Sequence, residues 1–109
     1  MASVFTRIIN RELPARIFHE DDEVIVIADH RPQAPVHLLI IPKAVTKNFY
    51  ETSDETLSML SRKAKMIAEK LGITGHFRLI INNGYCQEVD HIHFHFLSNR
   101  GAENLKWIE

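Results

Sequence analysis

The longest regular pattern in the chain predicts a helix over residues 54–71. Apolar side chains recur there at steps of three and four, which puts them on one helical face: Leu57, Leu60, Ala64, Ile67, Ala68 and Leu71. Charged residues lie off that stripe and predict a solvated face: Lys63, Lys65, Glu69 and Lys70. The preceding "TSDE" favours a capping box that joins Thr52 to Glu55, and Gly72 provides a helix stop.

The other apolar runs are shorter, rich in β-branched residues and bounded by turn residues, which predicts strands. They cover residues 15–20, 23–29, 36–42, 77–83 and 91–97. The third run, "VHLLIIP", is typical of a strand buried on both faces, and a short helix is predicted over 4–11. The expected class is α+β, with a five-stranded, mainly antiparallel sheet, one long helix and one short helix in a single domain over 1–109.

Composition excludes several classes of protein. The 109 residues carry a net charge of −1, which gives no bias toward nucleic acid or a membrane surface. No apolar run is long enough to span a bilayer, and the first residues lack the pattern of a signal peptide. Cys86 is the only cysteine, so an intramolecular disulfide is impossible and a cysteine-based zinc site is not expected. We therefore expect a cytoplasmic protein.

Candidate chemistry is concentrated in "HIHFHFL", residues 91–97, where three of the seven histidines stand at alternate positions. Because strand side chains alternate between faces, His91, His93 and His95 share one face. The residues between them face the other way, toward the predicted 54–71 helix: Ile92, Phe94 and Phe96. The imidazoles form a row, which leaves three readings open: a metal site, a solvated polar face, or free imidazoles that perform chemistry.

The first two readings are the weaker alternatives. Zinc needs three or more ligands that converge on one ion, and a straight row of histidines converges poorly, although His37, Glu88 or Asp90 offers a further ligand. A merely solvated face leaves the repeated spacing unexplained. The third reading is an imidazole nucleophile, which is mostly neutral at pH 7, attacks phosphorus through its bare nitrogen and then departs readily. Such a nucleophile needs an acceptor on its other nitrogen, donors for the phosphate oxygens and a proton for the leaving group.

The motif resembles the signature of the histidine triad (HIT) superfamily. "HRPQAPVHLLIIPK", residues 30–43, resembles the first-half motif of the Hint branch, the histidine triad nucleotide-binding proteins. "FRLIINNGYCQEVDHIHFHFLSNRG", residues 77–101, resembles that branch's second-half block. The likeness covers a core of about 3–101 and leaves a C-terminal tail, 98–109, that departs from the branch.

The resemblance implies hydrolysis of purine nucleoside 5′-phosphoramidates without a cofactor or metal. His93 would attack the α-phosphorus and form a nucleotidyl-histidine intermediate, from which water releases the nucleoside monophosphate. The backbone carbonyl of His91 would orient the His93 ring, and His95 would contact the phosphate. His37 would join the network with His91 as a support. The resemblance further implies a homodimer with one ten-stranded sheet.

The same resemblance implies a binding site for the nucleotide. Asp29 would hold the ribose hydroxyls, and residues near it or in the first helix would line the base pocket: Val4, Phe5, Ile8, Ile27 and His30. Asn82 and the Gln87–Glu88 segment would bind the phosphate through side-chain amide and backbone N–H groups.

This sequence departs from the branch in the phosphate loop. Cys86 stands at a glycine position, and Glu88 puts a carboxylate beside the expected phosphate. The departures keep two further functions open: a nucleotide-binding or protein-interaction module with little turnover, and a histidine-based metal-binding protein.

Overall fold

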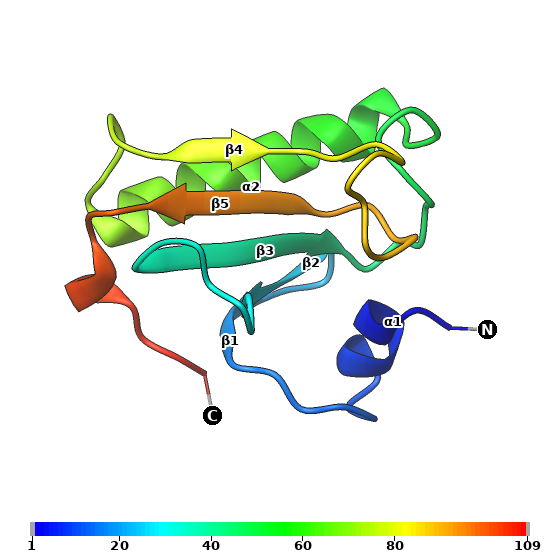
Figure 1. The fold of residues 1–109 in the computed structure, drawn as a ribbon, viewed down its shortest axis with the longest axis horizontal. Coiled ribbons are helices and arrows are strands. Elements are labelled where there is room, and N and C mark those ends of the chain that lie inside the picture. Colours follow the sequence, from blue (N-terminus) through cyan, green and yellow to red (C-terminus); the bar gives the residue numbers. More distant parts are fainter. Residues whose placement is uncertain (1, 109) are drawn as a thin grey trace.

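The computed structural model describes residues 2–108 and contains one antiparallel sheet with a long helix across it (Figure 1). Its elements are α1 (Val4–Ile9), β1 (Ile17–Glu20), β2 (Val24–Ala28), β3 (Val36–Pro42), α2 (Asp54–Leu71), β4 (Arg78–Ile80), β5 (Phe94–Ser98) and the 3-10 helix η1 (Ala102–Asn104). The strand order is β1-β2-β3-β5-β4, with every neighbouring pair antiparallel. The α+β class predicted from the sequence is confirmed.

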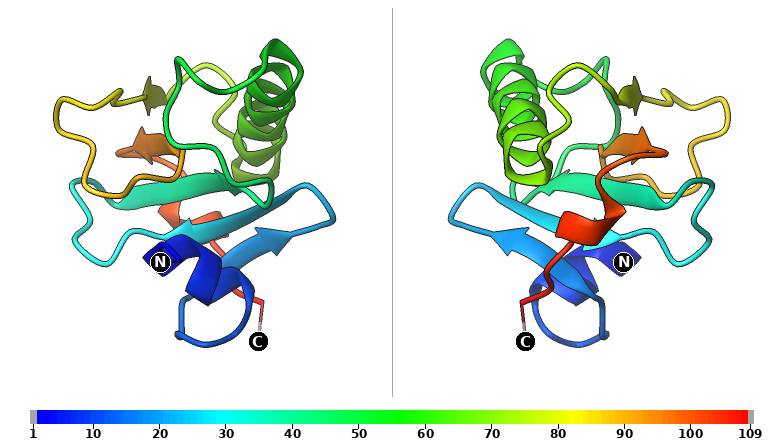
Figure 2. Two further views of the ribbon diagram at one scale, coloured as in Figure 1. Left: turned by 90° about the vertical axis from the view of Figure 1, so that its right-hand side faces the viewer. Right: turned by 90° about the vertical axis from the view of Figure 1, so that its left-hand side faces the viewer.

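The two faces of the sheet are covered by different helices (Figure 2). The apolar stripe of α2 packs on one face, where alternate residues of β2, β3 and β5 are buried with it, among them Val26, Leu38 and Phe96. The opposite face holds a smaller cluster under α1: Phe5, Ile8, Ile25, Ile27, Leu39 and Ile41. All seven residues of β3 are buried, as expected for the strand that lies between both layers.

The cap of α2 differs from the predicted one. Ser53 caps the helix, because its side chain accepts the N–H of Thr56, whereas Thr52 is buried and donates its hydroxyl to the Asn48 carbonyl at 2.6 Å. The predicted capping box is therefore wrong, because the Thr52 hydroxyl bonds to the turn before the helix and does not cap it. Gly72 ends the helix in the left-handed conformation, with φ of 70°, as predicted.

Four strands are shorter than predicted, and β4 and β5 differ most from the predicted bounds. β4 covers only Arg78–Ile80, and β5 begins at Phe94 instead of residue 91. β5 pairs with β3 from Phe94 onward, while the N–H of Ile92 donates to the Thr46 carbonyl in the loop after β3. The first two histidines of the triad therefore precede the strand.

The C-terminal tail returns to the β1 edge of the sheet. After η1, Trp107 lies edge-on to Phe18 at 6.4 Å, and the guanidinium of Arg16 lies 4.2 Å from the centre of the indole ring. The N–H of Ile108 donates to the Ile17 carbonyl. Within residues 2–108 the chain forms no helix with the length and apolarity needed to cross a bilayer.

Candidate active site

The triad lies on the sheet face opposite α2, as the alternation predicts. Ile92, Phe94 and Phe96 join the core under α2, while the His93 and His95 rings meet on the other face with centres 5.0 Å apart. Phe5 from α1 stands edge-on to His93 at 4.9 Å. The helix that sequence spacing identified at the N-terminus therefore forms a wall of the site.

His93 has one bound nitrogen and one open nitrogen. Its Nδ1 lies 2.9 Å from the His91 carbonyl oxygen, which can only accept, so Nδ1 carries the hydrogen and Nε2 keeps its lone pair. The side chain is 7% exposed, and burial lowers the pKa of His93 although the bond to the His91 carbonyl opposes that shift. A neutral ring with a bare nitrogen is the form that a nucleophile requires.

His37 determines the opposite tautomer for His95. The backbone N–H of Gln33 donates to Nδ1 of His37 at 3.0 Å, so the hydrogen of His37 resides on Nε2. That Nε2 lies 3.0 Å from Nδ1 of His95 and donates to it. His95 therefore accepts at Nδ1 and carries its hydrogen on Nε2. Burial lowers the pKa of both His37 and His95, which keeps this chain of neutral rings intact at pH 7.

His37 joins the histidine network through His95, whereas His91 bonds elsewhere. The His91 ring is fully buried, and its Nε2 donates to the Pro42 carbonyl at 2.9 Å. Its Nδ1 lies 3.0 Å from the hydroxyl of Ser3, which also caps α1 by accepting the N–H of Thr6. Sequence reasoning missed Ser3; its place before the first helix predicts a cap but not a bond to His91.

Asp29 lies at the base of the histidine pair. Its Oδ2 is 3.4 Å from Nε2 of His37 and 4.0 Å from Nδ1 of His95, while Oδ1 accepts the N–H of Arg31 at 2.8 Å. The carboxylate that was predicted to hold the ribose therefore also lies beside the histidine network. It raises the pKa of His37, though less than burial lowers it.

The same three side chains form a candidate cation site. Ligand atoms of Asp29, His37 and His95 lie within 4.8 Å of one another, and two nitrogens with a carboxylate oxygen are a donor set that zinc uses. The fit is partial. Ligation through Nε2 of His37 would place its hydrogen on Nδ1, where it would oppose the N–H of Gln33.

The loop before the triad is braced by Gln87. Its Oε1 accepts the N–H of Gly84, and its Nε2 donates to the carbonyls of Lys47 and Val89. Because both amide hydrogens are used, the Gln87 side chain holds the loop in place and is not directed at a phosphate, contrary to expectation. Cys86 adopts φ of 63° and so keeps the left-handed conformation of the glycine it replaces, at some steric cost.

The remaining predicted residues divide into two groups. Phe5, Ile8 and Ile27 pack together in the cluster under α1, and Phe5 reaches the triad. Val4 and His30 are exposed, and Asn82 is half-buried. Glu88 is exposed; burial lowers the pKa of His93 and His95, and the negative charge of Glu88 opposes that shift.

Comparisons with known proteins agree with this geometry. The HIT domain family model matches residues 10–102. A HIT-like protein of Synechocystis is 44% identical over 103 residues, covering 90% of each chain. A 14 kDa zinc-binding protein of Brassica juncea is 36% identical over 112 residues, covering 96% of each chain. A solved HIT family hydrolase from Clostridium thermocellum has 43% identity and a TM-score of 0.82, covering 88% of this chain and 89% of that one.

Names among the further matches point to nucleotide chemistry. An Arabidopsis thaliana protein with 37% identity is named adenylylsulfatase HINT1, and the match covers 96% of this chain and 74% of that protein. A solved Candida albicans structure, named a histidine triad nucleotide-binding protein, has 29% identity and a TM-score of 0.80, with 87% of this chain and 73% of that chain covered.

Proposed function

Since the chain belongs to the HIT domain family, we propose that it is a nucleotide-binding hydrolase that cleaves purine nucleoside 5′-phosphoramidates through an intermediate on His93. The observation that supports this most directly is the pair of complementary tautomers. His93 offers a bare Nε2, and the adjacent His95 offers an N–H. One ring can attack phosphorus while the other donates to a phosphate oxygen or to the departing group.

The proposed reaction has two steps. In the first, the lone pair on Nε2 of His93 attacks the α-phosphorus, the P–N bond breaks and its electron pair leaves with the amine nitrogen. That nitrogen takes up a proton from solvent, while the Nε2–H of His95 donates a hydrogen bond to a phosphate oxygen. In the second step water attacks phosphorus and releases a proton to solvent, and His93 departs as a neutral imidazole. The products are a free amine and a nucleoside monophosphate.

The proposed nucleotide site keeps the expected roles, with one change. Asp29 holds the ribose, and the base lies against the α1 side of the sheet, where Phe5 and Ile27 pack. Asn82 and the backbone of Glu88 contact the phosphate, while Gln87 acts as a brace for the loop.

The test is hydrolysis of adenosine 5′-phosphoramidate with EDTA present, next to a His93→Ala variant. We expect AMP release by the wild type and a loss of about 10³-fold or more in the variant, because no other group replaces the nucleophile. The intermediate provides a second readout, as acid-labile radiolabelled nucleotide bound to the wild type alone. Turnover that persists in His93→Ala contradicts the proposal.

The same assay separates the alternative functions. AMP binding without turnover in the wild type indicates a nucleotide-binding module. Turnover that EDTA abolishes, together with zinc in protein purified without a histidine tag, indicates that a metal at Asp29, His37 and His95 takes part.

The proposal includes a homodimer, a ten-stranded sheet and a cytoplasmic location. Support for the dimer comes from β4, which lies at one edge of the sheet and exposes Leu79 at 40%. A monomeric mass by light scattering contradicts it. Support for the location is limited to the free thiol of Cys86.

A further inference from the structure

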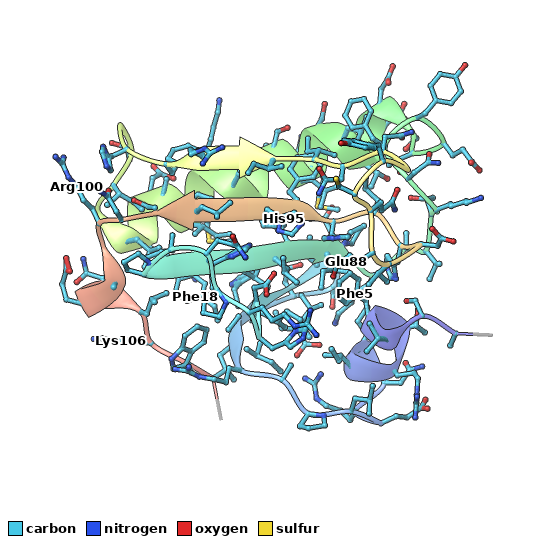
Figure 3. All side chains as sticks on the ribbon, in the orientation of Figure 1. Phe5, Phe18, Glu88, His95, Arg100 and Lys106 are labelled. Atoms are coloured by element: carbon cyan, nitrogen blue, oxygen red, sulfur yellow. The ribbon has the colours of Figure 1, made fainter. Side chains whose placement is uncertain are left out.

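Glu88 brings a negative charge to the rim of the triad. Val89, the next residue, packs against the cluster under α1 that contains Phe5, and Phe5 touches the His93 ring. Figure 3 shows Glu88 near Phe5 and His95, at the end of β5 where the loop enters the strand. Burial lowers the pKa of both His93 and His95, and the negative charge of Glu88 opposes that shift at both rings.

The position of Glu88 is well defined by its neighbours. Gln87 ties the loop to the Lys47 and Val89 carbonyls, and the Gln87 N–H donates to the Gly84 carbonyl. Glu88 therefore stands between a braced residue and a packed one.

The charge of Glu88 is not neutralised by an ion pair within residues 2–108. The lysines and arginines in ion pairs there serve other carboxylates: Arg7 with Glu12, Arg11 and Lys43 with Glu20, and Lys63 with Asp21 and Glu23. The four histidines of the site are neutral at pH 7, and Asp29 supplies a second carboxylate. Of the groups just described, the two that carry a negative charge at the site are Glu88 and Asp29, and none carries a positive charge there.

We propose that Glu88 selects substrates by the charge beyond the scissile bond, favouring leaving amines that carry a cation and disfavouring anionic leaving groups and additional phosphates. This selectivity rests on the proposed phosphoramidate hydrolysis. A cation on the leaving group is attracted to the carboxylate at the rim, whereas a carboxylate or a further phosphate is repelled by it. Repulsion also assists release of the dianionic monophosphate.

Three adenosine 5′-phosphoramidates of similar length test the selectivity: the amides of 1,3-diaminopropane, butylamine and β-alanine, which end in a cation, a neutral group and an anion. The readout is the ratio of kcat/KM for the cationic amide to that for the anionic amide, in the wild type and in Glu88→Gln. Because the same two amides are used with both proteins, differences in the intrinsic reactivity of the amides cancel when the two ratios are compared. We expect the ratio to fall about tenfold in Glu88→Gln, and the wild-type ratio to shrink in about 0.5 M salt.

Asp90→Asn is the matched control. Asp90 is exposed and lies two residues further along the chain, beyond Val89, which packs against the cluster under α1. The control variant should keep the wild-type ratio. A ratio that changes less than twofold in Glu88→Gln, or equally in Asp90→Asn, overturns the inference.

A binding measurement separates this inference from the proposed function. If no amide is hydrolysed, the proposed function fails, and calorimetric affinities for AMP and ATP still report on Glu88. Glu88→Gln should strengthen ATP binding about threefold more than AMP binding, because ATP carries more negative charge. If Glu88→Gln changes the affinities for AMP and ATP equally, the proposed role of Glu88 is wrong, whether or not the protein is a hydrolase.

Discussion

Two clusters of polar residues in this protein, one with several histidines and one around the single His19, show how the same residue type acquires different roles. On the face opposite α2, the rings of His93 and His95 each have one nitrogen held by a partner and one open nitrogen. At the turn between β1 and β2, both nitrogens of His19 have partners, Asp21 at 2.6 Å and Lys70 at 3.3 Å. A ring whose nitrogens are both occupied can stabilise the fold, but it has no lone pair for a substrate.

The clusters also differ in the charge of their side chains: the histidines of the site are neutral, whereas Asp21 at the turn is ionised and paired. Burial lowers the pKa values of His91 and His93 and keeps those rings neutral. At the turn, burial alone would raise the pKa of Asp21, but hydrogen bonds from Lys63 and His19 outweigh it and hold the pKa well below the usual range. Lys63 was expected on a solvated helix face, and that expectation is wrong because its ammonium lies 2.8 Å from Asp21.

Among changes that leave both His93 and His95 in place, the largest effect should come from removing His37, which determines the tautomer of His95. His37→Ala should lower kcat about 10²-fold, because the Nε2–H of His95 is no longer enforced. His37→Gln should recover part of the loss, since an amide can donate to Nδ1 of His95. The matched control, His19→Ala, should retain wild-type kcat. Steady-state kinetics with melting curves of all three variants check this, and an equal loss in His19→Ala would contradict the comparison.

Asp21→Asn should lower the free energy of unfolding by about 2 kcal/mol at pH 7, because the amide replaces a carboxylate that accepts from Lys63 and His19. Since the pKa of Asp21 is lower in the folded than in the unfolded chain, its stabilisation is complete above about pH 4 and is lost as the pH falls further. Denaturant titrations at pH 7 and pH 3 should show the variant and wild type converging in acid. The exposed neighbour provides a control, Asp22→Asn, which should change stability little.

The smallest effect concerns pH and the neutral rings of the site. Because burial lowers their pKa values below 6.5, kcat/KM should stay level from pH 8 to 6.5 and decline only below that. The unfolded chain binds more protons than the folded chain just below pH 6.5, so the free energy of unfolding should fall by about 1 kcal/mol between pH 6.5 and 5.5. Rate profiles and denaturation at several pH values measure both, and an acid limb centred above pH 7 would show charged rings.

Hydrophobic periodicity predicted most of the fold. The α2 stripe, the buried β3 strand and the assignment of Ile92, Phe94 and Phe96 to the core were all correct, since each depends on spacing within one element. The exact bounds of β4 and β5 were wrong because pairing between strands, β5 with β3 and β4 with β5, decides where those strands begin and end, and local propensity does not report it.

The sequence by itself determined that three histidines share a face and that their spacing suits a phosphorus nucleophile. Only the tertiary structure decided which nitrogen is open. The bond between His37 and His95 joins residues 58 positions apart, and the contact of Ser3 with His91 spans 88. Periodicity reports the face of a side chain but not its partner across the sheet, and the partner sets the tautomer and the reactivity of each ring.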